Sequence, residues 1–565
     1  MQADTLLLVH PAAWQSATTN YAAFKKRLGF AVTNISVESV GGGAGPGVAA
    51  MRAWLTDYRL GLGASNGTAY VLFLGNFNTI PAPIFRVTTN ANTFKSDIVY
   101  RDLHTEFDAD GDGVYGEYSA SGGEDFEDAT FPAVFTAISN DLIVGRMPFD
   151  AVSQPETIST ALAHCMAFER ETGARKSSGF LTAGRIMTWV TGIGELPADS
   201  WDYVVKQIAV AVTNNFSGKQ ITTVVHVASN YTDRTGIDHA VEGDAITGDY
   251  DRGQDIVRSL WENNDNYSFL CNCSHGGSNY DFALRRNGAG LPSGVHPGVV
   301  ISMSCASFLL GRSAFLEGLA VSYLGSTATV TPDVENIVLW GGKMVSGEVQ
   351  KMAVMDIFCN SFTIGEAFAH GFDYYIDTIP SAGLGVFFSR AKSDILRNIS
   401  GFQIIGDPTL VLAYPDSDTD GLLDAEERTI GTGIDNPDSD GDGLPDGLEF
   451  ETAGFDALVH NGEDVDYDGS CNADELVAGT SPFDDFDYLA FDGFAVTSGI
   501  LAASWHGVSG RVYELYLTTD LLSEAWDEAP GFGCVTGSGT IVCHTNAMPP
   551  ESACFYRIGV RLQDP

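Results

Sequence analysis

The sequence predicts an α/β protein with two mostly parallel-sheet units side by side, followed by a calcium-loop repeat segment and a small C-terminal β-sandwich. Up to about residue 415, short apolar runs alternate with amphipathic helical patterns, which is typical of parallel sheets covered by helices. The composition then changes abruptly to Asp and Gly, and from about residue 483 to aromatic and β-branched runs. We therefore expect four parts, at residues 1–150, 151–415, 416–482 and 483–565.

The first unit opens with an apolar strand at residues 6–9. A helix over residues 14–28 follows, because apolar side chains recur there every three or four positions. The alternation continues with a strand at 31–37, a helix at about 48–58, and strands at 70–74 and 142–145.

The second unit repeats the same alternation after a boundary near residue 150. Its apolar runs are short and continuous, which favours strands buried on both faces. We expect helices at about 155–172, 201–212 and 254–262, and strands at 179–184, 221–227, 267–273, 298–303 and 320–325.

The charge balance excludes several classes of partner. Acidic residues outnumber basic ones 73 to 30, which gives a formal net charge of -43 and argues against nucleic acid or anionic lipid. No window approaches the roughly 18 apolar residues of a membrane-spanning helix, so we expect no membrane span. Bound divalent cations are the natural counter-charge.

The nine cysteines are too few for a disulfide scaffold in a chain of this length. Cys534 and Cys543 flank the turn-rich stretch VTGSGTIV. This pattern predicts one local disulfide across a hairpin.

The segment after Pro415 carries the same acidic pattern three times. The spacing is D-x-D-x-D-G-x-x-D-x-x-E, in which alternate carboxylates converge and the glycine permits a sharp turn. The three sets of predicted calcium ligands are Asp416, Asp418, Asp420, Asp424 and Glu427; Asp438, Asp440, Asp442, Asp446 and Glu449; and Asp464, Asp466, Asp468, Asn472 and Glu475.

Fourteen of these fifteen side chains are carboxylates, and they would repel one another without cations. A solvated acidic linker is the plainer interpretation, but it does not explain one register kept three times. The segment resembles thrombospondin type 3 repeats, and this resemblance implies a rigid, calcium-filled spacer.

A shorter copy of the pattern lies in the first unit. Asp108, Asp110, Asp112 and Gly113 match the start of such a loop, whereas Gly116 and Ser119 miss its later ligand positions. Glu117 is a nearby substitute. The stretch is either a further calcium site or an exposed acidic turn.

Two chemically suited residues follow neighbouring strands of the second unit. His275 comes directly after YSFLCNC and before Gly276, and Cys305 follows GVVISM and Ser304. An imidazole that accepts the thiol proton makes the sulfur a nucleophile and later protonates the leaving amine. The backbone amides of Gly276 and Cys305 are candidates for an oxyanion hole.

The order of apolar strand, His-Gly, apolar strand and Cys resembles caspase-like peptidases, and further segments resemble the gingipain family. These segments are FLGNFNTIP at 73–81, SDIVYRDL at 96–103, DLIVGRMPF at 141–149, AVSYLGST at 320–327 and IIGDPTL at 404–410.

The resemblance covers residues 1 to about 415 and implies a non-catalytic caspase-like unit followed by a catalytic one. It implies a secreted or cell-surface, bacterial cysteine endopeptidase that cleaves proteins or peptides, with Cys305 and His275 as catalytic residues. It also suggests cleavage after Arg or Lys, with Asp199 in the specificity pocket, although Asp199 is equally suited to capping a helix. For a third catalytic residue the sequence offers only the distant Glu195.

Two alternatives stay open at this point. Cys271, Cys273 and His275 alternate along one strand, and with Cys305 they would make four zinc ligands. The whole chain is alternatively a calcium-stiffened adhesin or binding module whose peptidase fold does not cut.

Overall fold

In the computed structural model the chain forms two compact units, Met1–Pro415 and Asp416–Pro565. From here on, these are the first and the second unit, and both α/β units that the sequence predicts lie within the first. The structure describes a set of ranges with gaps between them. These are 3–41, 47–63, 67–87, 93–119, 124–127, 135, 137–185, 188–190, 194–196, 220–227, 245–247, 267–273, 276–277, 280–281, 298–302, 307–326, 354, 356–357, 360–381, 389–452, 454–460, 464–522, 525–547 and 554–562.

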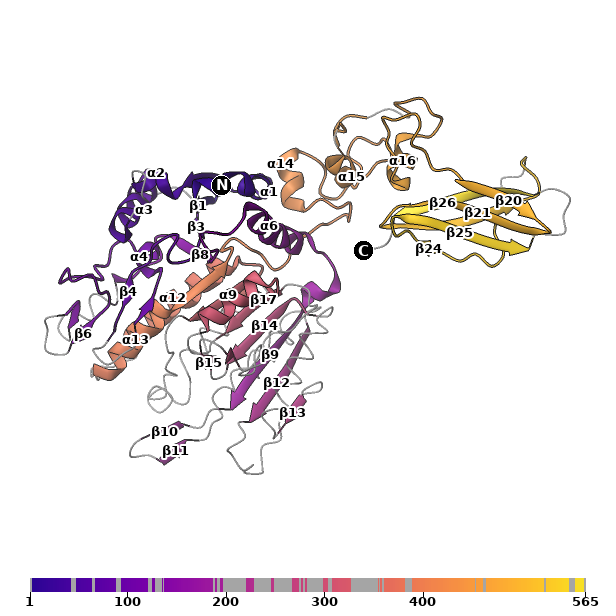
Figure 1. The fold of residues 1–565 in the computed structure, drawn as a ribbon. Coiled ribbons are helices and arrows are strands. Elements are labelled where there is room, and N and C mark those ends of the chain that lie inside the picture. Colours follow the sequence, from indigo (N-terminus) through magenta and orange to yellow (C-terminus); the bar gives the residue numbers. More distant parts are fainter. Residues whose placement is uncertain are drawn as a thin grey trace. The chain divides into compact units, whose positions relative to one another are not determined.

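The first unit is organised by one mixed sheet that takes strands from both predicted α/β units (Figure 1). Strands that the sequence predicts at 6–9, 70–74, 221–227 and 298–303 are all present in it. In spatial order the strands are β13 (Ala245–Thr247), β12 (Gln220–Val227), β9 (Ser178–Arg185), β14 (Phe269–Cys273), β17 (Gly298–Ser302), β18 (Ala320–Ser326), β19 (Phe402–Gly406), β8 (Ile143–Met147), β3 (Ala69–Leu74), β1 (Thr5–His10) and β2 (Ala31–Ser36).

Neighbouring strands of this sheet are parallel except at one place. β18 and β19 are antiparallel, with Tyr323 opposite Ile405, whereas β19 and β8 are parallel again. The sheet therefore consists of two parallel halves that run in opposite directions. β19 comes from the end of the second predicted unit but joins the half that contains the strands of the first.

Both faces of the sheet are buried, as the continuous apolar runs predict. Along β1, Leu6 and Leu8 belong to one hydrophobic cluster and Leu7 and Val9 to the other, because successive side chains of a strand point to opposite faces. The helices that pack on the first face are α1 (Thr19–Arg27), α6 (Pro155–Arg170) and α9 (Phe308–Leu316); those on the second are α3 (Val48–Leu62), α4 (Ile98–Arg101) and α13 (Ser389–Gly401), and α12 (Ile364–Ser381) contributes to both.

The prediction of an α/β protein with mostly parallel strands is confirmed, but the strands predicted for two units form one large mixed sheet. The predicted helices at 155–172 and 48–58 are α6 and α3, whereas those at 201–212 and 254–262 lie outside the described residues. None of the described helices is long and apolar enough to cross a membrane.

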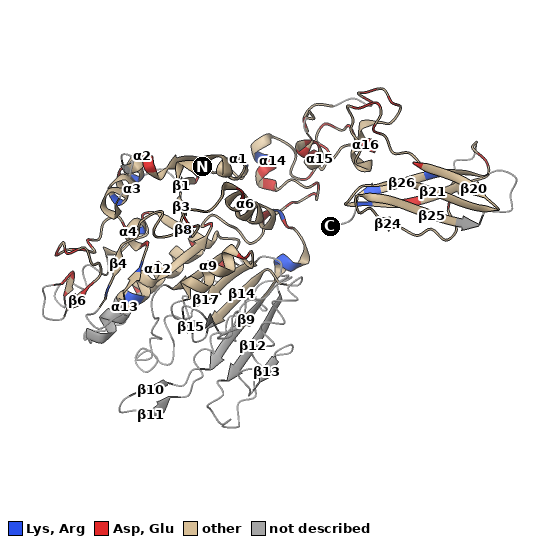
Figure 2. Cartoon of the chain, in the orientation of Figure 1, with Lys and Arg blue, Asp and Glu red and all other residues tan. Residues whose placement is uncertain are grey.

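The second unit begins with three acidic loops, each followed by a short helix. The helices are α14 (Asp424–Ile430), α15 (Asp446–Glu451) and α16 (Asn472–Ala478). They begin at the ninth position of each predicted calcium loop, so the Glu at position twelve lies in the first helical turn. Acidic residues are dense along this segment and in the loops beside β6 (Tyr118–Ser119) of the first unit (Figure 2).

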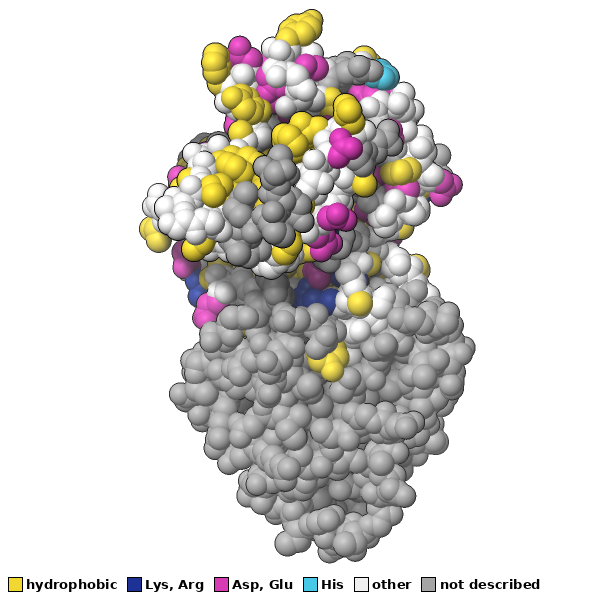
Figure 3. Space-filling model, turned by 90° about the vertical axis from the view of Figure 1, so that its right-hand side faces the viewer, with side chains coloured by type: hydrophobic (Ala, Val, Ile, Leu, Met, Phe, Trp, Pro, Cys, Tyr) yellow, Lys and Arg dark blue, Asp and Glu magenta, His cyan; other side chains and the backbone are white. Residues whose placement is uncertain are grey.

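Small antiparallel sheets complete the second unit, where the sequence predicts a β-sandwich. One contains β20 (Gly493–Thr497), β21 (Ile500–Gly507) and β25 (Thr540–Ala547); in the other, β22 (Arg511–Thr518) pairs with β23 (Asp527–Glu528), β24 (Val535–Thr536) and β26 (Phe555–Leu562). Trp505 of the first sheet and Tyr513 of the second share one cluster. Other hydrophobic side chains of this unit are exposed, including Phe494, Val496 and Ile541. Figure 3 shows hydrophobic and acidic side chains interspersed on the face it draws.

The predicted disulfide between Cys534 and Cys543 is wrong, because both thiols are free. Cys543 lies on β25, whereas Cys534 precedes β24 of the other sheet and its Sγ donates to Glu514 Oε1 at 3.2 Å. The stretch between them connects two sheets and does not close one hairpin.

Candidate functional site

The two strands that precede the predicted catalytic residues are direct neighbours. β14 and β17 are parallel, with Cys271 opposite Ile301 and Asn272 opposite Ser302. The carboxyl ends of adjacent parallel strands meet at one edge of a sheet, which is where α/β proteins place their sites. β14 ends two residues before His275, and β17 ends three residues before Cys305; both of these residues lie outside the described part of the chain.

Gly276, a predicted oxyanion-hole residue, begins a small hairpin. β15 (Gly276–Gly277) pairs with β16 (Tyr280–Asp281) in an antiparallel manner. On the other strand, α9 begins at Phe308, three residues after Cys305. Each predicted catalytic residue thus lies in a short connection between a buried strand and a second defined element.

The zinc alternative is tested only at its first ligand. Cys271 is 1% exposed and lies within a hydrophobic cluster that includes Leu181 and Ile301. This environment is typical of a buried structural thiol. The side chains of Cys273, His275 and Cys305 lie outside the described residues.

The predicted specificity segment begins after β9. A small antiparallel hairpin follows that strand, in which Trp189 of β10 (Thr188–Val190) lies opposite Glu195 of β11 (Gly194–Leu196). Asp199 comes three residues after this hairpin, outside the described residues, so its two predicted roles stay predictions.

Three segments that resemble the gingipain family meet at one buried ion pair. Arg146 of β8 is fully buried, and its Nε and Nη2 donate to Asp97 Oδ2 and Oδ1 at 2.8 and 2.7 Å. Its Nη1 donates to the carbonyl oxygens of Gly75 and Ile80 at 2.8 and 3.0 Å. These three segments are therefore held together at the ends of β3 and β8. None of these contacts involves a predicted catalytic residue.

A second buried charge cluster links helices α1 and α6 to the residue that follows β19. Lys25 Nζ of α1 lies 2.6 Å from Glu169 Oε2 of α6 and 2.7 Å from Asp407 Oδ2, which directly follows β19. Burial raises the pKa of Glu169 to about 7, although Lys25 opposes this shift. The landmark IIGDPTL thus contributes Asp407 to an ion cluster within the core.

The three repeat loops share one backbone conformation. Residues at position four have left-handed φ values of 64° at Thr419, 77° at Gly441 and 64° at Tyr467, and the glycines at position six have values of 96° to 100°. In each loop the first Asp accepts a hydrogen bond from the backbone amide at position four, at 2.7 to 2.8 Å. The repeated spacing in the sequence therefore corresponds to a repeated structure.

The side chain at position nine fastens each loop. Asp424 and Asp446 accept hydrogen bonds from the backbone amides of Ser417 and Ser439 at 2.9 and 2.7 Å. Asn472 takes the same role toward the residue at position two of the third loop, at 3.0 Å. This side chain therefore positions the loop as well as being a predicted ligand.

Several buried carboxylate oxygens of the repeats have no hydrogen-bond partner. Both Oε atoms of Glu427 and of Glu475 are in this state, although these side chains are only 0% and 1% exposed. Burial, with neighbouring carboxylates adding to it, raises the pKa of each to about 7. Buried oxygens of this kind are costly without a counter-charge, so the loops fit a hard cation with oxygen ligands.

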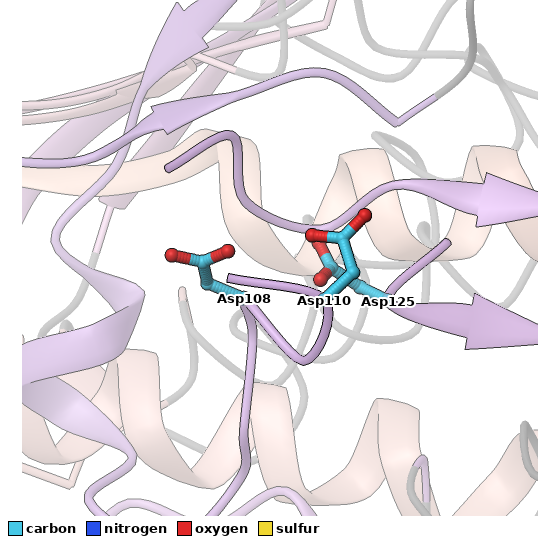
Figure 4. A group of neighbouring side chains, drawn as sticks. All are labelled: Asp108, Asp110 and Asp125. Carbon is cyan, nitrogen blue, oxygen red and sulfur yellow. The ribbon is translucent and has the colours of Figure 1, made fainter. Parts of the chain in front are cut away.

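The loop at residues 108–113 uses an acidic residue that the sequence pattern does not reveal. Oxygens of Asp108, Asp110 and Asp125 lie within 4.8 Å of one another (Figure 4). Asp125 is twelve residues past Gly113, and part of the intervening chain lies outside the described residues, so no fixed spacing signals it.

The chain has measurable likeness to known proteins along most of its length. No curated protein sequence matches it. Among solved structures, the Arg-specific cysteine proteinase gingipain R (RgpB) is 11% identical over 91% of this chain and 87% of that chain, with a TM-score of 0.46. A complex of the pro- and mature domains of Porphyromonas gingivalis RgpB is 13% identical over 72% and 79% of the two chains, with a TM-score of 0.45.

A family model gives the decisive match. The model of peptidase family C25 covers residues 1–413, which include the whole mixed sheet and both predicted catalytic residues. The chain therefore belongs to peptidase family C25 and is a cysteine endopeptidase.

Proposed function

We propose that the protein is a secreted, calcium-binding endopeptidase in which Cys305 is the nucleophile and His275 its acid and base. The observation that carries the proposal is the direct pairing of β14 with β17 within the C25 match. No other pair of neighbouring strands in the described sheet is followed so closely by one His and one Cys.

The proposed mechanism is acyl transfer. His275 takes the proton of the Cys305 thiol, and the sulfur attacks the carbonyl carbon of the scissile peptide bond. The tetrahedral oxyanion is held by the backbone amides of Gly276 and Cys305, and His275 protonates the departing amine. Water then attacks the thioester, which releases the carboxylic acid and returns the proton to the thiol.

The test is a comparison of single substitutions with an active-site label. We expect Cys305→Ala and His275→Ala each to reduce peptide hydrolysis by at least about a thousandfold, as loss of a nucleophile or its base does in related mechanisms. A thiol-directed inhibitor should form one adduct, on Cys305.

The control is Cys271→Ala, which removes a buried thiol below the same strand end. It should keep kcat/KM within about tenfold, because it empties only a small core volume. An active Cys305→Ala enzyme would contradict the proposal. Loss of activity in Cys271→Ala together with released zinc would favour the metal site.

We also propose that calcium fills the three loops of residues 416–475. The support is the set of buried, unpartnered oxygens described above, together with the shared backbone conformation. Sites of this type in extracellular modules bind calcium with Kd values of about 0.1 to 1 mM. A secreted or cell-surface location, which we propose, would supply the calcium that loops of such affinity need.

For specificity we propose cleavage after Arg or Lys, with Asp199 in the pocket that receives this side chain. A carboxylate in a partly dry pocket pairs with a cationic side chain, and with Arg it does so through two parallel hydrogen bonds. A panel of fluorogenic peptides that differ only in the residue before the cut tests this. A preference for an apolar or acidic residue there, or an Asp199→Ala enzyme with unchanged activity on Arg substrates, would overturn it.

A further inference from the structure

The acidic loop at residues 108–113 shares backbone features with the three repeats. Gly111 and Gly113 have φ values of 76° and 84°, and they occupy the positions that are left-handed in each repeat. The amide of Asp112 donates to Asp110 Oδ1 at 3.2 Å, and the amide of Val114 donates to Asp112 Oδ1 at 2.7 Å. The second repeat has the corresponding bonds at 3.1 and 2.9 Å.

Asp125 takes the structural place of the missing ninth position. Its Oδ1 accepts a hydrogen bond from the amide of Ala109 at 2.6 Å, as Asp446 does from the amide of Ser439 at 2.7 Å. Its Oδ2 accepts from the amide of Glu117 at 3.0 Å. A residue from outside the pattern thus closes the loop in the manner of the repeats.

Glu117 supplies an independent indication of a ligand. The residue is 2% exposed, and its Oε1 accepts hydrogen bonds from Nε and Nη2 of Arg86. Its Oε2 is buried and has no hydrogen-bond partner. Carboxylate oxygens of Glu117, Asp110 and Glu124 lie within 4.8 Å of one another, so this group faces the loop, as Glu427 and Glu475 face theirs.

We propose that Asp108, Asp110 and Asp125, with Glu117 and Glu124, form a fourth calcium site that is separate from the repeat segment. Asp110 belongs to both groups of converging oxygens, so it is the central ligand. Oxygen donors alone, all of them carboxylates, favour calcium over zinc or copper. The site is independent of the proposed calcium binding at residues 416–475.

The site would fasten a peripheral part of the peptidase unit to its core. Tyr118 of β6 pairs with Phe126 of β7 (Phe126–Glu127), and both side chains belong to the same hydrophobic cluster as Phe107. The proposed ligands lie between these anchors along the chain. A bound cation therefore links the loop, the strand pair and the core into one cooperative element.

Hydrogen exchange of the full-length protein, followed by mass spectrometry, tests the site. The measurement compares the peptide covering residues 107–119 without calcium and with calcium chloride at about 100 times the apparent Kd. If calcium binds only the closed loop, local opening becomes about 100-fold rarer at that concentration, and amide exchange slows by the same factor. In Asp110→Asn the slowing should fall below about tenfold, because the variant removes the shared ligand from an exposed position that the fold does not need.

The matched control is Asp57→Asn, which removes one exposed charge from α3 and should respond to calcium like the wild type. Glu124→Gln serves as a second variant if Asp110→Asn shows raised exchange in β3 and β8 without calcium. Equal exchange of residues 107–119 with and without calcium would overturn the proposal, even if residues 416–475 become protected. Wild-type protection in both ligand variants would overturn it as well.

Discussion

The peptidase unit and the repeat segment bury charged side chains in opposite ways. In residues 1–415, Asp97 is paired with Arg146, and Lys25 lies between Glu169 and Asp407. In residues 416–475, the described part of the chain offers buried carboxylate oxygens that no protein group satisfies. In these two ion clusters of the first region the chain itself supplies the counter-charge, whereas for the buried carboxylates of the repeats we propose that calcium supplies it.

The two regions also differ in how much hydrophobic surface they bury. The described residues form three hydrophobic clusters, and none of these contains a residue from 416–482. A few leucines of the repeats, such as Leu422 and Leu444, are buried only locally. The repeat segment therefore buries little apolar surface to offset its conformational entropy, and the proposed calcium ions would be its main stabilising contribution.

The largest expected effect follows from removing calcium. At a calcium concentration 100 times Kd, each filled site stabilises the folded loop by about 2.7 kcal/mol, so three sites contribute about 8 kcal/mol. We expect a chelator to allow proteolytic cuts within residues 416–478 while the sheet of residues 1–415 stays resistant. Limited proteolysis, with the fragments identified by mass spectrometry, measures this difference.

The control for chelation is the addition of magnesium in place of calcium. Magnesium demands octahedral geometry and retains its waters, so it should restore little of the resistance. Equal resistance of the repeats with and without chelator would remove the contrast between the two regions. Cuts that appear first in the central sheet would reverse it.

A second, smaller effect is expected from the ion pair of the peptidase unit. Arg146→Met leaves Asp97 buried without its partner, which costs about 3–5 kcal/mol of unfolding free energy. Because no metal ion takes part in this pair, the loss of stability should be the same with and without calcium. Urea denaturation of the wild type and the variant, followed by tryptophan fluorescence, measures it.

Arg312→Met is the matched control. Arg312 Nη2 lies 2.7 Å from Asp150 Oδ2, but the two side chains are 30% and 51% exposed. An exposed pair contributes less than about 1 kcal/mol. If both variants lost the same stability, burial would not be the cause, and the proposed role of Arg146 would fail.

The sequence predicts regular and periodic features of this molecule well. Continuous apolar runs are sufficient to locate β1, β3, β14 and β17, because strands buried on both faces admit little else. The spacing of the repeats likewise predicts their loops, since every proposed ligand follows a fixed offset from the first Asp. The reversal of direction between β18 and β19 is not predictable in this way, because apolar runs carry no information on pairing partners.

Contacts between residues that are far apart in the sequence are not predictable for the same reason. Asp125 completes a loop that starts at Asp108, and Lys25 finds its partners at residues 169 and 407. No period relates these positions, and only the folded chain brings them together. His275 and Cys305 are predicted from a local signal, because each follows a recognisable strand.

The smallest expected effect concerns the serine at position two of the repeats. Ser439 Oγ donates to Asp446 Oδ2 at 2.6 Å and accepts from the amide of Gly433 at 2.9 Å, whereas Ser417 Oγ makes a single bond of 3.0 Å to Asp424 Oδ2. The third loop has Val465 at this position and keeps only the backbone bond to its Asn at position nine, so the hydroxyl is dispensable for the loop conformation.

We therefore expect Ser439→Ala to weaken calcium binding about two- to tenfold, equivalent to the roughly 0.5–1.5 kcal/mol of one net hydrogen bond, and Ser417→Ala to weaken it less. Calcium titrations followed by calorimetry measure both changes. Loss of all binding in Ser439→Ala would mean that the serine fixes the loop itself, and the interpretation of the repeats as loops organised by carboxylates and cations would then be wrong.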